Sequence, residues 1–198
     1  MELTPELAEL VGAIVGDGHV RVDRIRPAYQ IYIFGHKTED AEYLIHLKEL
    51  ILKIFKTEMN FRTRKEENTA MLSKNSKQIV MILYKRFGIF GNKTNDCGIP
   101  EEIMESEQTV KKSFLRGFFD TDGSIYKLKF GIQMAFCNRA LPLLRSARGI
   151  LVSLGYSPSK VSGYNFYLTR RDDLRKYCQE IRFGNPKHFG RAKGFGIV

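Results

Sequence analysis

The chain lacks the features that would place it in a membrane or in an oxidising compartment. Its 198 residues include no tryptophan and only three cysteines, Cys97, Cys137 and Cys178. The cysteines are odd in number, widely spaced and form no C-x-x-C pair, which argues against a disulfide framework or a zinc site. No apolar run approaches the roughly 20 residues of a membrane span, and the acidic residues 1–6 show no signal-peptide pattern. These absences predict a cytoplasmic protein with no membrane partner, an organelle being the alternative.

Negative charge is also in short supply. The chain has 32 Lys and Arg against 22 Asp and Glu, a formal net charge of +10, while 43% of its residues are hydrophobic. The hydrophobic share predicts a globular protein with a core, and the positive excess favours a polyanionic partner. Because ribosomal and membrane-surface proteins share such a charge, it indicates nucleic acid without identifying the function. The four histidines form no H-E-x-x-H metal motif.

The sequence is organised as two similar halves. An apolar segment at residues 7–15 ends in Gly16-Asp17-Gly18, and another at residues 110–120 ends in Thr121-Asp122-Gly123. Each is followed by two strand-like runs, at residues 19–26 and 28–34 in the first half and at residues 124–129 and 132–136 in the second. This repetition predicts that one structural unit occurs twice.

The remainder of each half continues the repeat. Helical spacing of apolar residues at 38–55 and 138–154 is followed by second strand pairs, near residues 60–64 and 69–73 and near residues 160–162 and 165–169. Shorter helices are predicted at residues 76–87 and 171–183. The fold class is therefore α+β, a pseudo-twofold duplication of an αββαββα half-domain with two antiparallel sheets. The predicted half-domains are residues 1–94 and 109–198, joined by a linker at 95–108, and the chain is expected to act as a monomeric pseudo-dimer.

Two aspartates stand where a helix disfavours them. Asp17 and Asp122 each end an apolar helix, where the negative end of the helix dipole opposes a carboxylate by roughly 0.3–1 kcal/mol. One such Gly-Asp-Gly is readily explained as a helix stop and turn, but two copies indicate that a bound cation offsets the cost. Small residues spaced one turn apart, Gly12 with Gly16 and Gly117 with Thr121, let two helices approach closely.

Parallel packing of these helices would bring the two carboxylates to one end. The backbone oxygens of Gly16 and Thr121 would then be available as further metal ligands beside Asp17 and Asp122. Coordination by oxygen alone favours Mg²⁺ or Mn²⁺ over zinc. The sequence thus predicts a divalent-metal site at the interface between the halves.

These two segments also resemble a known family. Residues 10–18, LVGAIVGDG, and residues 115–123, LRGFFDTDG, resemble the two motifs of a monomeric LAGLIDADG homing endonuclease. The resemblance implies that the motif helices form the interface and that Asp17 and Asp122 are catalytic metal ligands. At the sixth motif position the copies differ, with Val15 in the first and Asp120 in the second, and Asp120 is expected to be structural.

The resemblance further implies an activity. It is site-specific cleavage of both strands of a long, asymmetric DNA target by metal-dependent phosphodiester hydrolysis, leaving short 3′ overhangs, by an intron-encoded enzyme. Mg²⁺ or Mn²⁺ is the expected cofactor, with Ca²⁺ binding but not supporting cleavage. Paired metals suit such an in-line displacement.

Lysines are the candidates for assisting the reaction. Lys93 and Lys187 occupy matching places in the two repeats and are predicted to be catalytic, by polarising water or stabilising the transition state. Lys37 and the preceding His36 resemble positions that hold polar, water-organising residues in the family, whereas the second half has Phe136-Cys137-Asn138 there. An asymmetric site is therefore expected. The alternative for each lysine is an ordinary phosphate contact or a solvated charge.

DNA recognition is assigned to the strands, because a two-stranded ribbon fits the major groove. The predicted DNA-binding residues alternate along the strands, and the alternative for each is a solvated strand face. They are Arg21, Gln30, Tyr32, Lys37, Arg62 and Arg64 in the first half and Tyr126, Lys127, Lys129, Gln133 and Tyr167 in the second.

Other functions remain open at this point. A non-cleaving nucleic-acid-binding module, such as an intron-splicing maturase with intron RNA as a partner or a DNA-binding regulator, would share the scaffold. Two intact motif carboxylates argue against that loss of cleavage. An intein is less expected, because the chain starts at the first motif region and leaves no room for a self-splicing domain. A ribosomal protein would explain the charge but not the duplicated acidic helix ends.

Overall fold

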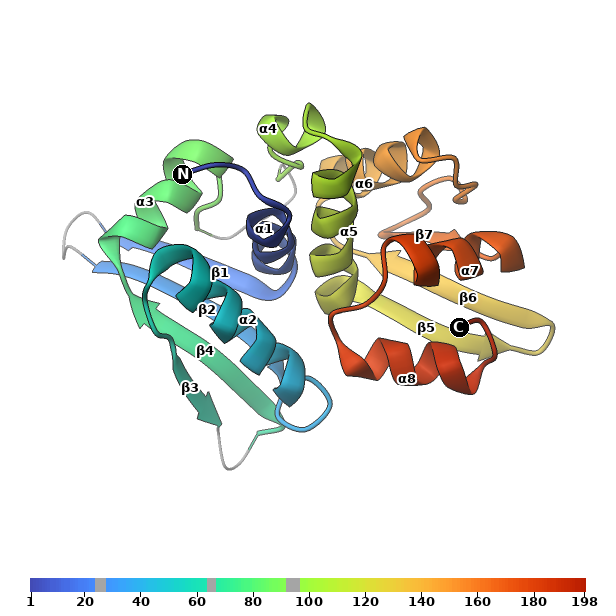
Figure 1. Ribbon diagram of the computed structural model, residues 1–198, viewed down its shortest axis with the longest axis horizontal. Helices are drawn as coiled ribbons and strands as arrows, with labels where there is room; N and C mark the ends of the chain where they lie inside the picture. Colours follow the sequence, from blue (N-terminus) through green and yellow to red (C-terminus); the bar gives the residue numbers. More distant parts are fainter. Residues whose placement is uncertain (24–27, 64–66, 92–96) are drawn as a thin grey trace.

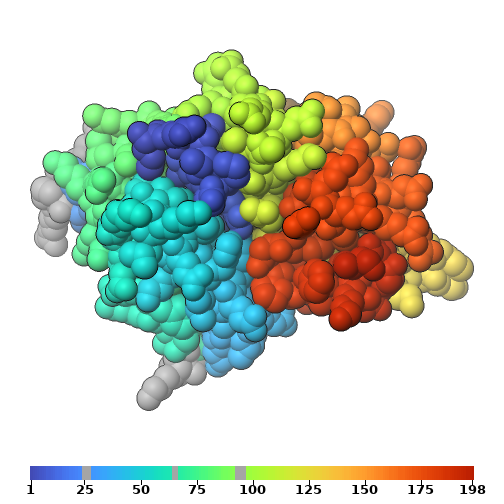
Figure 2. Space-filling view, viewed as in Figure 1, coloured from blue at the N-terminus to red at the C-terminus, as the bar shows by residue number. Residues whose placement is uncertain are grey.

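The protein consists of two halves that meet along a pair of central helices, α1 (Pro5–Asp17) and α5 (Gln108–Asp122). The structure is a computed structural model that describes residues 1–23, 28–63, 67–91 and 97–198. In each half one antiparallel sheet is covered by helices on a single face (Figure 1). The space-filling view shows the two halves lying against each other, blue to green on one side and yellow to red on the other (Figure 2). Among the described helices, none is long and apolar enough to span a membrane.

The first half contains a four-stranded sheet in the order β1-β2-β4-β3. Ile31 and Ile33 are fully buried on the face that the helices cover, and the residues between them face outward, as the two-residue period of a strand requires. The elements of this half are β1 (Gly18–Asp23), β2 (Ala28–His36), α2 (Ala41–Phe55), β3 (Asn60–Thr63), β4 (Thr69–Asn75) and α3 (Lys77–Phe87).

The second half contains a three-stranded sheet in the order β5-β6-β7. The short helix α4 (Glu101–Met104) precedes it, within the predicted linker. The elements are β5 (Gly123–Leu128), β6 (Gly131–Cys137), α6 (Leu141–Ser153), β7 (Asn165–Leu168), α7 (Arg171–Glu180) and α8 (Pro186–Gly194). The α+β class, the two antiparallel sheets and the central pair of motif helices are all confirmed.

Glycines allow α1 and α5 to pack with their backbones nearly in contact. A Cβ atom added at Gly12 would meet the carbonyl oxygen of Phe114 and lie 2.9 Å from the amide nitrogen of Phe118. A Cβ atom at Gly117 would meet the carbonyl oxygen of Glu9 and lie 2.9 Å from the amide nitrogen of Ala13. The close helix approach predicted from the small residues is therefore present, and it fixes the ends of the two helices relative to each other.

The predicted strand at residues 160–162 is not formed. Ser162 makes only an isolated bridge to Asn165 around Gly163, which has a φ of 55°. The amide of Tyr167 donates to the hydroxyl of Ser159 at 3.0 Å, so a side chain accepts the bond that a neighbouring strand's carbonyl would have accepted. The second sheet accordingly has three strands instead of four.

The helix α8 was not predicted from the sequence, which contains Gly190 and Gly194 in this segment. It begins as helices commonly do, with Pro186 in the first turn and the Asn185 side chain accepting from the amide of Lys187 at 3.1 Å. Asn185 and Pro186 are therefore the sequence signal for the start of this helix, since its apolar periodicity did not reveal it.

Candidate active site and nucleic-acid interface

Each motif helix passes directly into the first strand of its sheet, with the motif aspartate as its last residue. α1 ends at Asp17 and β1 begins at Gly18, and α5 ends at Asp122 and β5 begins at Gly123. A Cβ atom at Gly18 would lie 2.6 Å from the carbonyl oxygen of Ile14, so only glycine permits this turn. The two carboxylates are thus held at the corner between helix and strand.

The two corners meet at the interface of the halves. The position of a Cβ atom on Gly16 lies 3.3 Å from Oδ2 of Asp122 and directly against the Oγ1 atom of Thr121. The carboxylate of Asp122 therefore faces the backbone beside Asp17, from the other half of the chain. Asp17, Asp122, Gly16 and Thr121 are all half-buried, which leaves this end open to solvent and ligand. The structure brings together all four predicted metal-site residues.

The donor atoms at this end fit a hard divalent cation. Among the described residues, no group of three or more His, Cys, Asp or Glu side chains is placed to hold one ion. An ion between Asp17 and Asp122 would therefore take its remaining oxygen ligands from backbone carbonyls, water or a phosphate. This is the ligand mixture that Mg²⁺ accepts, since it retains water and binds through one or two carboxylates plus phosphate oxygens.

Asn138 orients one of the two carboxylates. Its Nδ2 atom donates to Oδ2 of Asp122 at 2.6 Å, and its Oδ1 atom accepts from the amide of Ala140 at 2.7 Å. Its own amide donates to the carbonyl of Tyr164 at 3.0 Å, so the residue is fixed at both ends. Burial, followed by the negative charge of Asp122, raises the pKa of the adjacent Cys137 thiol. The sequence placed Asn138 opposite Lys37 in the repeat but did not name it as a site residue.

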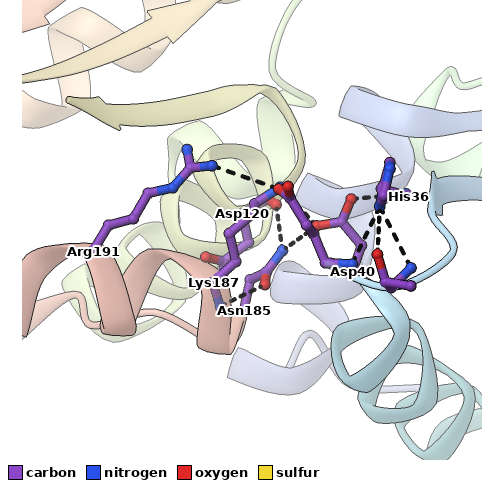
Figure 3. A network of polar contacts seen from close by, with 8 residues as sticks. His36, Asp40, Asp120, Asn185, Lys187 and Arg191 are labelled. Carbon is purple, nitrogen blue, oxygen red and sulfur yellow. Dashed lines mark hydrogen bonds and ion pairs between the residues drawn. The ribbon is translucent and has the colours of Figure 1, made fainter. Parts of the chain in front are cut away.

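Lys187 lies in a bridge between the halves. Its Nζ atom is 2.7 Å from Oδ1 of Asp40, and Nδ2 of Asn185 donates to the same oxygen at 2.8 Å (Figure 3). The other carboxylate oxygen of Asp40 accepts from the amide of His36 at 2.8 Å. Burial opposes the charge on Asp40, but the hydrogen bonds from Lys187, His36 and Asn185 hold its pKa below the usual value. The N-terminus of α8 is thereby tied to the turn that follows β2.

The other predicted catalytic positions lie elsewhere. Lys93 falls outside the described residues. Lys37 lies in the turn after β2, where its amide donates to the carbonyl of Asn68 at 3.0 Å. Asp120 is 1% exposed, and its Oδ2 atom accepts from the amide of Gly184 at 2.6 Å. Burial raises the pKa of Asp120 well above its usual value. Asp120 therefore lies in the core of the second half, which agrees with the expected structural role.

A buried ion pair joins the halves beside these groups. Glu9 is 2% exposed and pairs with Arg116 of α5, while its other oxygen lies 2.9 Å from Nε2 of His46 on α2. Burial alone would raise the pKa of Glu9, but the bond to His46 and the charge of Arg116 lower it. The carboxylate therefore stays ionised at the interface, and α1, α2 and α5 share it.

The strand register separates the predicted DNA-binding residues by face. In the first sheet Arg21 lies opposite Gln30, and Tyr32 and Arg62 share their outward side, away from the helices. Four of the six residues predicted in the first half thus lie on one surface. Lys37 lies beyond the strand, and Arg64 is outside the described residues.

The second sheet divides its predicted residues. Tyr126 lies opposite Gln133, and Tyr167 lies opposite Ala135 on the same outward face. Lys127 follows the two-residue alternation to the opposite face, the side of the buried Ile125. Lys129 belongs to the turn between β5 and β6. A strand cannot present consecutive side chains to one surface, so Tyr126 and Lys127 do not share the outer face.

Comparison with known proteins agrees with this geometry. Residues 109–182 match the family model described as a LAGLIDADG-like domain. The fold is similar to that of I-DmoI in complex with DNA and Mn, with a TM-score of 0.67 at 17% identity over 91% of this chain and 98% of that one. It is also similar to the homing endonuclease I-WcaI bound to its DNA recognition sequence, with a TM-score of 0.59 at 12% identity over 96% of this chain and 87% of that one. Residues 109–182 thus match a LAGLIDADG-like domain, and the fold of the chain is similar to the folds of the homing endonucleases I-DmoI and I-WcaI.

Curated relatives share only a segment with this chain. The replication factor C small subunit of Methanocaldococcus jannaschii is 27% identical over 92% of this chain and 10% of its own length. The tRNA-splicing ligase RtcB of Pyrococcus furiosus is 31% identical over 62% of this chain and 14% of its own length. The chain therefore spans about a tenth to a fifth of the length of the curated relatives it matches. Their names describe unrelated activities, so the shared segment gives no ground for assigning either activity to this chain.

Proposed function

We propose that this chain is a site-specific endonuclease that cuts both strands of DNA by metal-dependent phosphodiester hydrolysis. The observation that carries the proposal is the meeting of Asp17 and Asp122 at the ends of two packed helices, one from each half. The solved structures of similar fold include complexes with DNA and with Mn or Ca. Two carboxylates on a pseudo-twofold axis suit a reaction that must act once on each strand.

The residues of the chain have separate tasks in this scheme. Asp17 and Asp122 bind the cation, with backbone oxygens of Gly16 and Thr121 beside them. A divalent ion held there supplies Lewis-acid polarisation of the scissile phosphate and an activated water. Asn138 holds one oxygen of Asp122 in place and so fixes the orientation of this carboxylate. Mg²⁺ or Mn²⁺ is the proposed cofactor, with Ca²⁺ supporting binding without cleavage.

The two sheets are proposed to lie along the major groove on either side of the cut. Each sheet presents an antiparallel ribbon of the kind this groove admits. Because the outward faces differ in sequence, the target is asymmetric, and a monomer covers both half-sites. Cleavage on both sides of the pseudo-twofold axis, across the minor groove, gives short 3′ overhangs.

A cleavage assay tests the proposal. The substrate is DNA flanking the insertion point in the host gene, incubated with Mg²⁺, Mn²⁺ or Ca²⁺. Asp17→Asn and Asp122→Asn should each slow cleavage by more than the roughly 10- to 100-fold that loss of an outer-shell partner costs. DNA affinity, measured by gel shift in Ca²⁺, should change little and fall steeply with salt. The matched control is Asp172→Asn on the exposed side of α7, which should cleave like the wild type.

The outcomes against the proposal are specific. Full cleavage by either motif variant would remove the assigned metal role. The second candidate function, a DNA- or RNA-binding module without cleavage such as a maturase, draws support from Lys187, a predicted catalytic lysine that is instead paired with Asp40. That candidate predicts tight binding with no cleavage in any of the three metals.

A further inference from the structure

The outward faces of the two sheets differ in their chemistry. On the first sheet the register builds two rows across the strands, Arg21 with Gln30 and Asn75, and His19 with Tyr32, Ser73 and Asn60, and Arg62 stands in the next row. Five of these side chains carry a carboxamide or a guanidinium group. They are Gln30, Asn60, Asn75, Arg21 and Arg62.

The outward face of the second sheet is poorer in such groups. Its rows are Cys137 with Asn165, Ser124 with Ala135 and Tyr167, and Tyr126 with Gln133. All of these residues belong to the described range 97–198, and among them the strands present two carboxamides and no guanidinium. Tyr126 and Tyr167 share this face, and burial, followed by the neighbouring Tyr167, raises the pKa of Tyr126.

These groups differ in how sharply they distinguish bases. A carboxamide of Asn or Gln forms two hydrogen bonds with N6 and N7 of adenine, and a guanidinium forms two with O6 and N7 of guanine. A hydroxyl group of Ser or Tyr has one donor and can contact several bases or a phosphate. A face rich in carboxamides and guanidiniums therefore discriminates among base pairs, and a face of phenols and small residues tolerates substitution.

The carboxamides of the first sheet are also available. Within the described part of the chain, the side chains of Gln30, Asn60 and Asn75 have no hydrogen-bond partner, whereas those of Asn138 and Asn185 are committed to protein groups. The three line one hollow of about 440 Å³ on the outward face, together with Tyr32, Arg62 and Ser73. Three free carboxamides around one hollow suit neighbouring adenines on one strand.

We infer that the first sheet carries most of the base discrimination and that Gln30, Asn60 and Asn75 read adenines in its half-site. The second sheet holds the other half-site through contacts that accept several bases. This inference rests on the proposed function, because it requires the outward faces to meet DNA. It assigns different degrees of sequence tolerance to two half-sites that the same monomer covers.

The test is a binding selection from duplex DNA with a randomised central segment, using the full chain in Ca²⁺ and sequencing the bound fraction. Conserved positions should gather on one side of the centre and be enriched in adenine. Gln30→Ala and Asn75→Ala should lower the preference at single positions on that side by about 5- to 150-fold, the usual cost of a lost bidentate contact. The control is Tyr126→Phe on the second sheet, which removes one hydroxyl group and should change the preference at its own position by less.

Each outcome separates the two proposals. Selected sequences with equal conservation on both sides, or a profile unchanged by Gln30→Ala and Asn75→Ala, would overturn this inference and leave the nuclease proposal standing. Recovery of no preferred duplex at all would overturn the proposed function and the inference with it. Each variant's melting temperature is measured beside the selection, so that a variant that fails to fold is recognised. Gln30→Glu then replaces it, because glutamate keeps the shape of the side chain and reverses the preference for adenine.

Discussion

Asn138 donates from Nδ2 to Oδ2 of Asp122 at 2.6 Å, while its side-chain Oδ1 atom accepts from the amide of Ala140. The side chain thus links the end of the motif helix α5 to the start of α6. Partners of metal-binding carboxylates fix the direction in which the free oxygen points and commonly affect metal affinity about 10- to 100-fold. The first half has Lys37, and not an asparagine, in the corresponding segment.

We therefore expect Asn138→Ala to raise the Mg²⁺ concentration needed for half-maximal cleavage by about 10- to 100-fold. DNA affinity in Ca²⁺-free buffer should stay within about twofold, because Asn138 is assigned to the carboxylate and not to DNA. The control is Asn138→Ser, whose hydroxyl can still accept from the Ala140 amide but does not reach Asp122 as the carboxamide does. Equal Mg²⁺ dependence in Asn138→Ala and the wild type would refute the positioning role.

Gly12→Ala tests the contact between the motif helices. The added methyl group would meet the carbonyl oxygen of Phe114, which is backbone and cannot turn aside. We expect a loss of about 1–3 kcal/mol in the free energy of unfolding, the usual cost of overpacking, measured by urea titration. Gly149→Ala on α6 is the control, because nothing lies within 4 Å of its Cβ position. It should gain about 0.5–1 kcal/mol, since alanine favours a helix more than glycine does.

The bridge between Lys187 and Asp40 is open to a double-mutant cycle. Both side chains are less than one-fifth exposed, so solvent screens the pair only partly. Combining Lys187→Ala with Asp40→Ala should reveal a coupling of about 0.5–3 kcal/mol in unfolding experiments. The neighbouring pair Arg191 and Glu39, at 3.5 Å and about half exposed, is the control and should show coupling near zero. If Lys187 were catalytic, Lys187→Ala would instead reduce the cleavage rate and show little coupling to Asp40→Ala.

The buried side chain of His188 should make the free energy of unfolding fall in mild acid. It packs against the rings of Phe119 and Phe183, and burial, followed by the charges of Lys187 and Arg191, lowers its pKa to about 3. An unfolded histidine takes up its proton near pH 6.5. Between these values the unfolded chain binds more protons, so stability falls as the pH is lowered, by up to about 1.4 kcal/mol per pH unit.

The measurement is urea unfolding at pH 7 and at pH 4.5. We expect His188→Phe to lose less stability between these two conditions than the wild type does. The comparison uses the change with pH within each protein, so a constant cost of the larger ring cancels. A wild-type slope retained in full by the variant would show that another group causes the acid sensitivity.

The motif helices and the pairing of their aspartates could be predicted because the signal is local and occurs twice. Gly16-Asp17-Gly18 and Thr121-Asp122-Gly123 each stop an apolar helix and each precede a strand, and symmetry then brings them together. Two-residue alternation also grouped four of the six first-half candidates on one face, but alternation alone does not tell which face lies outward. No such local signal could reveal that Asn138 reaches Asp122, since their contact depends on how β6 lies beside β5.

Longer-range features were missed for related reasons. Lys187 was matched with Lys93 by repeat symmetry, but its partner Asp40 is 147 positions away and in the other half. Tyr126 and Lys127 were both assigned to DNA, although the register allows only one of them on the outward face. The strand expected at residues 160–162 depended on a backbone acceptor that the hydroxyl of Ser159 replaces.

No residue separates Asp17 from the strand that begins at Gly18, or Asp122 from the strand that begins at Gly123. In each half, the distance between the aspartate and the side chains of the first strand is therefore fixed. In the proposed function, the metal-binding aspartate is covalently adjacent to the strand that contacts the bases. The distance between the contacted bases and the cleaved phosphate therefore cannot vary. One residue inserted in β1 or β5 would turn all later side chains of that strand over. A change of DNA target therefore has to come from substitution of side chains at existing positions. A change of strand length would move the base contacts relative to the cleaved phosphate.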